Sequence, residues 1–176
     1  FLRRKLKVGG VLYISYNTQP GWAGFAPMRH LMAEHAERMG AAGLGYESRV
    51  NGALDFMERM LGANPAYARA IPQVAERLKR MKDQNRQYLL HEYFNDVWQP
   101  MHFAEMVKWL GAAKMNYAVS ATYTDHVDAL CLTPDQQRFL KEIPDATFRE
   151  TVRDFMVNQQ FRRDYWVRGA RRLNAL

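Results

Sequence analysis

The pattern of hydrophobic and polar positions changes its period near residue 22. Val11 to Tyr16 is a run of strand-forming residues between the pair Gly9-Gly10 and the pair Pro20-Gly21. The basic stretch before the two glycines has the character of a helix end. Together these signals predict an α-turn-β unit of a doubly wound sheet. One such unit cannot bury both of its faces alone.

From Phe25 onward, hydrophobic residues recur every three or four positions, which predicts amphipathic helices. The predicted helices cover residues 25–39, 50–61, 67–81 and 100–110. Asn64 is a candidate N-cap for the third of them, with Pro65 at its first position. Pro72 lies inside this helix and should kink it or displace its start.

Two capping boxes, which begin at Thr133 and Thr147, predict two further helices. The second of these helices is expected to bury Phe148, Val152 and Phe155.

Short strands are predicted at residues 116–122 and, as a candidate last strand, at residues 165–167. Between the helices, the aromatic density of residues 88–100 indicates a buried, irregular connection.

The predicted fold is mainly α, a helical domain with two or three short strands, preceded by the α-turn-β remnant of a Rossmann-like sheet. We expect residues 1–22 to be this remnant and residues 23–176 to be the helical domain. Without its parent sheet, the strand 11–16 should be disordered, pair with another short strand such as 116–122, or pair across a dimer contact. The helices are expected to form the core regardless of the strand.

The composition of the chain indicates in which cellular compartment the protein is expected. The chain has 176 residues, 48% of them hydrophobic, and its single cysteine, Cys131, excludes an internal disulfide. No apolar run approaches the length of a membrane span, and the first residues lack the pattern of a signal peptide. We therefore expect a soluble, cytoplasmic protein. Because the sequence opens on Phe1, we also expect it to be a piece of a longer protein.

The formal net charge of +7 raises the question of an acidic partner. Much of the positive charge lies near the end of the chain, interrupted by Glu150, Asp154 and Asp164. Our interpretation is a solvated, partly paired face, with a nucleic-acid groove as the alternative. The arginines concerned are Arg149, Arg153, Arg162, Arg163, Arg168, Arg171 and Arg172.

Several catalytic classes lack their motifs. The five histidines include no pair three or four positions apart, so a metal site is not expected. Gly43-x-Gly45 is not followed by a third glycine and does not follow a predicted strand, which argues against a dinucleotide loop. No Walker motif or nucleophile elbow occurs, and Cys131 is interpreted as a buried small side chain. The sequence therefore does not predict a self-contained catalyst.

Two segments carry a resemblance to a known family. The segment 6–17, Leu-Lys-Val-Gly-Gly-Val-Leu-Tyr-Ile-Ser-Tyr-Asn, resembles the turn and fifth strand of class I S-adenosylmethionine-dependent methyltransferases, with Val8 where proline is usual. It is followed by Asn17-x-x-Pro20-Gly21-Trp22. Further along stands Tyr88-x-x-His91-Glu92-Tyr93-x-Asn95-x-x-Trp98-x-Pro100, and then the closing elements Arg149-Glu150, Arg153-Asp154-Phe155 and 161–164. Together they are similar to the predicted methyltransferase regulatory domain, which follows the methyl-transfer domain in some bacterial enzymes, including protein-lysine methyltransferases.

The resemblance implies that two domains of a longer polypeptide have separate roles. An upstream methyltransferase domain would bind S-adenosylmethionine, so no cofactor-binding residue is expected in this chain, and the chain alone should not be an active enzyme. Its implied function is that of a regulatory or substrate-recognition module. The implied partners are the upstream domain and a protein substrate, with neither nucleic acid nor membrane expected.

The candidate substrate-pocket residues fall in two groups. Tyr16, Asn17 and Trp22 lie at the carboxyl end of the predicted strand, where an open α/β sheet binds its ligands. The alternative is that Asn17 helps form a turn and Trp22 packs at a domain junction.

The second group is His91, Glu92 and Tyr93. A carboxylate beside an aromatic face attracts ammonium groups, so Glu92 or Tyr93 could receive a cationic amine substrate. The alternative is that the adjacent His91 and Glu92 are buried and fix the connection by hydrogen bonds to the backbone.

Two other functions remain open. The pI near 9.7 is compatible with a basic helical nucleic-acid-binding module, although no helix-turn-helix or zinc finger is present. The methionine-rich stripes of the first helices are compatible with a scaffold for partner docking.

Overall fold

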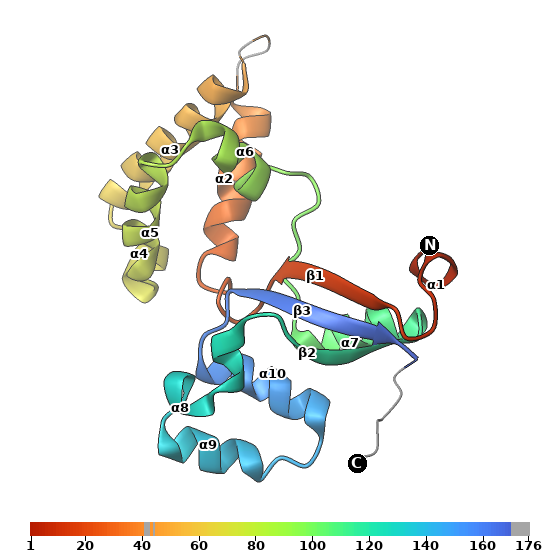
Figure 1. The fold of residues 1–176 in the computed structure, drawn as a ribbon. Coiled ribbons are helices and arrows are strands. Elements are labelled where there is room, and N and C mark those ends of the chain that lie inside the picture. Colours follow the sequence, from red (N-terminus) through yellow and green to blue (C-terminus); the bar gives the residue numbers. More distant parts are fainter. Residues whose placement is uncertain (41–42, 44, 170–176) are drawn as a thin grey trace, which may run out of the picture. The chain divides into compact units, whose positions relative to one another are not determined.

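The computed structural model describes residues 1–40, 43 and 45–169, which divide into two compact units (Figure 1). The sheet unit joins Phe1–Trp22 with the segment that begins at Gln99, and the helical unit is Ala23–Trp98. A boundary after residue 22 was expected, but residues 1–22 group with the second half of the chain rather than forming a separate piece.

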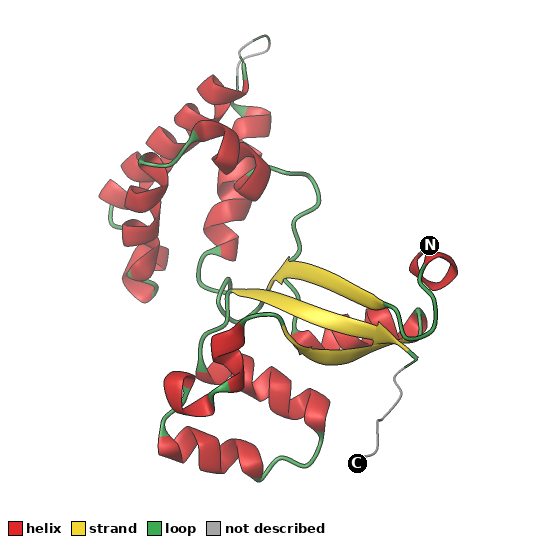
Figure 2. Cartoon of the chain, viewed as in Figure 1, coloured by secondary structure: helices red, strands yellow, loops and turns green. Residues whose placement is uncertain are grey.

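The described part of the helical unit consists of five helices (Figure 2). They are α2 (Ala26–Arg38), α3 (Tyr46–Gly62), α4 (Ala66–Ala70), α5 (Gln73–Lys82) and α6 (Arg86–Tyr93), with α3 in contact with α2, α5 and α6. The predicted stripes supply the core of this unit. Four methionines of these stripes are fully buried, as expected of core residues: Met28, Met32, Met57 and Met81. Met39, the last residue of the first predicted stripe, is instead 70% exposed.

Three local predictions in this unit need correction or refinement. Asn64 does not cap α4, because it adopts a left-handed φ of 52° and Pro65 takes the N-cap position. Pro72 breaks the predicted third helix into α4 and α5, as its missing N–H requires. The segment 88–100 is helical in its first part, because the Asn85 side chain accepts hydrogen bonds from the backbone N–H groups of Gln87 and Tyr88 and so starts α6.

The described part of the sheet unit contains three strands in the order β1-β3-β2. They are β1 (Val11–Asn17), β2 (Met115–Ser120) and β3 (Phe161–Arg168), and a short helix α1 (Leu2–Lys5) precedes them. Both β1 and β2 pair antiparallel with β3, so they run parallel to each other. The strand at the start of the chain does pair with another short strand, but its partner is β3 and not the expected 116–122.

The sheet has one covered and one open face. On the covered face, α7 (Phe103–Ala112) packs beneath the strands, and Leu12, Ile14 and Tyr16 contact a core built around Trp166, which is 0% exposed. The other face is open, with Val11 56% and Tyr13 49% exposed. In this unit the core is not independent of the strand, contrary to what we expected, because β1 contributes every second side chain to it.

A helical segment connects β2 to β3. It consists of a 3₁₀ turn (Tyr123–His126), α8 (Asp128–Cys131), α9 (Pro134–Lys141) and α10 (Ala146–Met156). Thr133 forms the predicted capping box at the start of α9.

The prediction for α10 is wrong in its N-cap and in its buried face. Asp145 is the N-cap, and Phe148 and Phe155 are 58% and 57% exposed. The side of α10 that faces inward carries Arg153 and Asp154 instead.

Two further points complete the description. Helix α7 begins at Phe103 after the N-cap His102, three residues later than the predicted start at Pro100. Over the described ranges, none of the helices combines the length and apolar character needed to cross a membrane.

Candidate functional site

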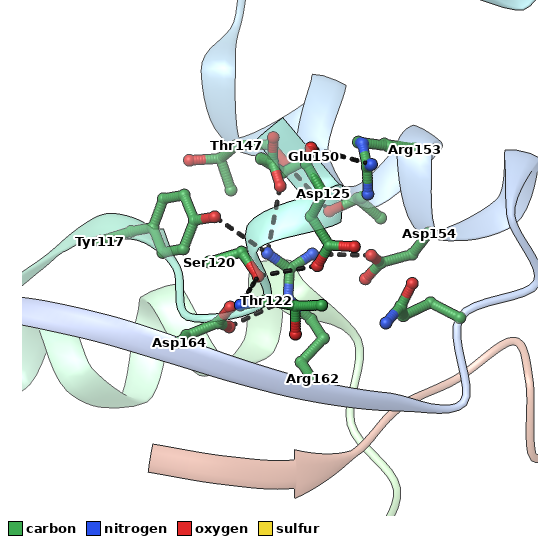
Figure 3. Close-up of polar contacts among 12 residues, drawn as sticks. Tyr117, Ser120, Thr122, Asp125, Thr147, Glu150, Arg153, Asp154, Arg162 and Asp164 are labelled. Carbon is green, nitrogen blue, oxygen red and sulfur yellow. Dashed lines mark hydrogen bonds and ion pairs between the residues drawn. The ribbon is translucent and has the colours of Figure 1, made fainter. Parts of the chain in front are cut away.

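A buried ionic cluster lies on the covered face of the sheet unit. Alternation along β3 places Arg162, Asp164 and Trp166 on this face. Arg162, with a side chain only 5% exposed, forms three ion pairs. Its Nη1 lies 2.6 Å from Asp154 Oδ1, its Nε 2.9 Å from Asp164 Oδ2, and its Nη2 3.1 Å from Glu150 Oε2 (Figure 3).

Two tyrosines and a phenylalanine complete the surroundings of the guanidinium group. Arg162 Nη2 donates a hydrogen bond of 3.2 Å to the Tyr117 hydroxyl, and the guanidinium lies 4.4 Å from the centre of the Phe103 ring. The Tyr16 hydroxyl donates a hydrogen bond of 2.7 Å to Asp164 Oδ2. We call this set the Arg162 cluster; its polar members are Arg162, Glu150, Asp154, Asp164, Tyr16 and Tyr117.

The Arg162 cluster places three carboxylates around one buried guanidinium, and two of them, Asp154 and Asp164, are themselves buried. Burial raises the pKa of Asp154 to about 7, although the neighbouring guanidinium opposes this rise. Burial also raises the pKa of Asp164, again against the effect of Arg162. Each aspartate keeps one buried oxygen without a hydrogen-bond partner, Oδ2 of Asp154 and Oδ1 of Asp164. The carboxylates are therefore less than fully compensated.

The two ionisable groups bonded to these carboxylates, Arg162 and Tyr16, both have raised pKa values. Burial would lower the pKa of Arg162, but the surrounding carboxylates outweigh it and raise this pKa. Burial and the nearby charge of Asp164 raise the pKa of Tyr16 far above its usual value. The Tyr16 hydroxyl therefore stays protonated and acts as a donor.

A second buried arginine ties α10 to the turn after β2. Arg153, 7% exposed, donates from Nη2 to the backbone carbonyl of Asp125 over 3.0 Å. Within that turn, Ser120 Oγ donates a hydrogen bond of 2.7 Å to Asp125 Oδ2 (Figure 3). The two arginines of this region thus hold α10 against both β2 and β3.

The structure brings the first group of sequence-predicted residues together at the carboxyl end of β1. Tyr16 joins the Arg162 cluster, and Asn17 Oδ1 accepts a hydrogen bond of 3.1 Å from Trp22 Nε1. Trp22 is 2% exposed, so its side chain is buried. The chain between them passes so close to residues 159–160 that a Cβ on Gly21 would lie 2.5 Å from the Gln159 carbonyl oxygen, which explains the glycine.

The second predicted group lies on α6, in the helical unit. His91 is exposed, Glu92 is half-buried and Tyr93 is buried. The rings of Tyr93 and Phe25 meet edge to face, with their centres 6.1 Å apart. The backbone carbonyl of Tyr93 accepts a hydrogen bond of 2.7 Å from Arg29 Nε. The two predicted groups therefore belong to different units.

The helical unit also contains a pocket of about 740 Å³. Arg29, Glu34 and Phe94 are among the described residues that line it, whereas His91, Glu92 and Tyr93 are not. Its wall mixes acidic, basic and apolar side chains, and the described residues contain no group of three His, Cys, Asp or Glu that could hold a metal ion.

Sequence reasoning missed the Arg162 cluster. The arginines near the end of the chain were interpreted as a solvated face, but Arg153 and Arg162 are buried and unable to contact a phosphate backbone. The available signal was the alternation of Arg162, Asp164 and Trp166, which is the period of a strand and not of a helix. Arg171 and Arg172 lie outside the described residues.

Comparisons with known proteins agree with this architecture. Residues 85–168 match the family model described as "Predicted methyltransferase regulatory domain". The uncharacterized protein sll1526 of Synechocystis is 48% identical over 169 residues, which cover 96% of this chain and 33% of that protein. The uncharacterized protein RP789 of Rickettsia prowazekii is 26% identical over 167 residues, which cover 90% of this chain and 28% of that protein.

Two solved structures share the fold. The structure of PKMT2 from Rickettsia typhi in complex with AdoHcy superposes with a TM-score of 0.66 at 22% identity, covering 94% of this chain and 31% of that chain. A second structure of PKMT2 gives a TM-score of 0.62 at 21% identity, covering 95% of this chain and 30% of that chain. The chain spans about a third of the length of these relatives. The family match over residues 85–168, together with this shared fold, confirms the resemblance to the predicted methyltransferase regulatory domain.

Proposed function

We propose that the chain is the substrate-recognition and regulatory module of a class I S-adenosylmethionine-dependent methyltransferase. In this proposal an upstream domain of the same polypeptide binds the cofactor, as the AdoHcy-bound PKMT2 neighbour suggests, and this chain shapes the acceptor side of the site. The family match supports the link to a methyltransferase, and the partial coverage of the relatives named above supports a larger parent protein.

The observation that carries this proposal is the incomplete sheet. Strand β1 ends the order β1-β3-β2, so no described strand pairs with its second edge. On the open face, Tyr13 and Tyr165 contact each other with ring centres 5.6 Å apart, and both are more than a third exposed. A sheet with an unpaired edge and aromatic side chains on its uncovered face is a surface for a further protein layer. We assign that layer to the upstream methyltransferase domain.

The acceptor side of the site follows from the end of β1. In this proposal β1 borders the open α/β sheet of the upstream domain, and ligands of such sheets bind beyond the carboxyl ends of their strands. At that end the Trp22 indole N–H donates a hydrogen bond to the side-chain oxygen of Asn17, and the Tyr16 hydroxyl donates one to Asp164. We therefore propose that Asn17 contacts the methyl acceptor and that Tyr16 and Trp22 hold Asn17 in the orientation this contact needs.

The acceptor proposed here is an amine of a protein, as in the protein-lysine methyltransferases that the sequence resembles. Glu92, half-buried on α6 beside Tyr93, would attract such a cationic group, and the exposed His91 flanks it. The helical unit would in this way contribute a second recognition surface.

The test uses the longer protein that contains this chain, with S-adenosylmethionine and a library of lysine-containing peptides as probes. Asn17→Ala should raise the acceptor KM about tenfold, the effect of one lost hydrogen bond, and leave the KM for S-adenosylmethionine unchanged. The matched control is Asn116→Ala, at an exposed position on β2, which should change neither constant. Equal effects of the two substitutions, or no methyl transfer by the unsubstituted protein, would overturn the proposal.

A further inference from the structure

The Arg162 cluster forms a continuous chain of contacts from α10 to the end of β1. Asp154 on α10 binds Arg162 Nη1 at 2.6 Å, Arg162 Nε binds Asp164 Oδ2 at 2.9 Å, and this same oxygen accepts the Tyr16 hydroxyl at 2.7 Å. Every link is a hydrogen bond, and two of the three are ion pairs. The chain connects residues that are far apart in the sequence but contact in the fold.

The guanidinium group makes this connection stiff. Its N–H donors lie in one plane at fixed angles, so Nη1 and Nε cannot move independently. A displacement of Asp154 must therefore tilt the whole group and carry Nε with it. The Phe103 ring, 4.4 Å from the guanidinium carbon, limits its other movements.

Asp164 transmits this movement to Tyr16, because a single oxygen of its carboxylate bonds both Arg162 and Tyr16. Its Oδ2 is shared by Arg162 and Tyr16, its Oδ1 has no hydrogen-bond partner, and the residue is 0% exposed. When Asp164 turns, the Tyr16 hydroxyl must follow or lose its acceptor.

From this geometry we infer that Asp154 and Glu150 on α10 are positioning residues, which fix Tyr16 at the carboxyl end of β1 through Arg162 and Asp164. This inference rests on the proposed function for its consequence, since Tyr16 precedes Asn17 in the proposed acceptor site. The helical segment between β2 and β3 is thereby coupled to that site. The coupling gives the helical segment a means of regulating the site.

The experiment measures the Tyr16 hydroxyl in the chain itself. With tyrosine ¹³Cζ-labelled, the NMR signal of Tyr16 is assigned by its loss in Tyr16→Phe. Asp154→Asn should shift the Tyr16 signal in the same direction as Asp164→Asn does, although no hydrogen bond among the described contacts joins Asp154 to Tyr16. Asp154→Glu, which retains the carboxylate, should move the signal back toward its original position. Because spectra are recorded where each variant is fully folded, a loss of stability alone does not move a native-state signal.

Two controls keep the result decisive. Asp135→Asn removes an exposed carboxylate on α9 that pairs only with Arg138 among the described contacts, and it should leave the Tyr16 signal unchanged. If Asp154→Asn does not fold, Glu150→Gln replaces it, because Glu150 is 28% exposed and better able to tolerate the change. A Tyr16 signal that coincides with that of the control would overturn the positioning role.

The outcome is separable from that of the proposed function. A shifted Tyr16 signal with no effect of Asn17→Ala on the acceptor KM supports the positioning role and overturns the acceptor site. An unchanged Tyr16 signal with a raised acceptor KM supports the acceptor site and overturns the positioning role.

Discussion

The Tyr16 hydroxyl donates a hydrogen bond of 2.7 Å to Asp164, a residue 148 positions later in the chain. This contact joins the first strand of the sheet to its central strand beneath the end where the proposed acceptor site lies. It also attaches a tyrosine selected from the sequence to an ionic cluster that the sequence did not reveal.

Tyr16→Phe should lower the free energy of unfolding of the sheet unit by about 1–2 kcal/mol, because a buried hydrogen bond to an ionised acceptor is lost. Urea unfolding of Tyr16→Phe, Asp164→Asn and the double variant measures their coupling. The two effects should be non-additive. The control is Tyr123→Phe, since Tyr123 is 90% exposed and should change the free energy by less than about 0.5 kcal/mol.

The raised pKa of Asp154 predicts a specific pH dependence of stability. Because its pKa is about 7 in the folded chain against 3.8 in the unfolded one, the folded state binds the proton more tightly. The stabilisation from this group is complete below pH 3.8 and is lost as the pH rises through about 7. Relative to Asp154→Asn, which does not titrate, the free energy of unfolding should fall over this range by up to about 4 kcal/mol. Parallel pH profiles for the two proteins would contradict this assignment.

Removal of residues 1–22 should unfold the sheet unit and spare the helical unit. The deletion strips β3 of one paired edge and removes Leu12, Ile14 and Tyr16 from the core around Trp166. Hydrogen exchange should show lost protection in α7 and retained protection in α3 and α5, whose partners lie within 23–98. Retained protection in α7 would mean that β1 is dispensable for this core.

The chain by itself should bind S-adenosylmethionine no more tightly than millimolar. The described Gly9-Gly10 turn precedes β1, whereas a nucleotide-binding glycine loop follows a strand and leads into a helix N-terminus. Isothermal titration with the protein near 100 μM covers the relevant affinity scale. Micromolar binding would show that a cofactor site lies within these residues.

The amino-acid sequence by itself determined most of the local structure. Apolar residues every three or four positions placed the core of α2, α3 and α5, because a helix buries one stripe irrespective of what covers it. The Thr133 capping box and the break at Pro72 could also be predicted from the sequence, since both depend on backbone groups only a few residues away. The family resemblance was also carried by short motifs.

The tertiary structure decided what the local pattern left open. Hydrophobic alternation predicts a strand but does not specify which strand pairs with it. The position of β3 between β1 and β2 is therefore known only from the pairing of distant segments in the fold. The same holds for Arg162, whose charge predicts exposure unless partners compensate it. Those partners are Asp154 and Glu150 on α10, Tyr117 on β2 and Asp164 on β3 itself, and only the assembled fold brings α10 and β2 within hydrogen-bonding distance of the guanidinium group.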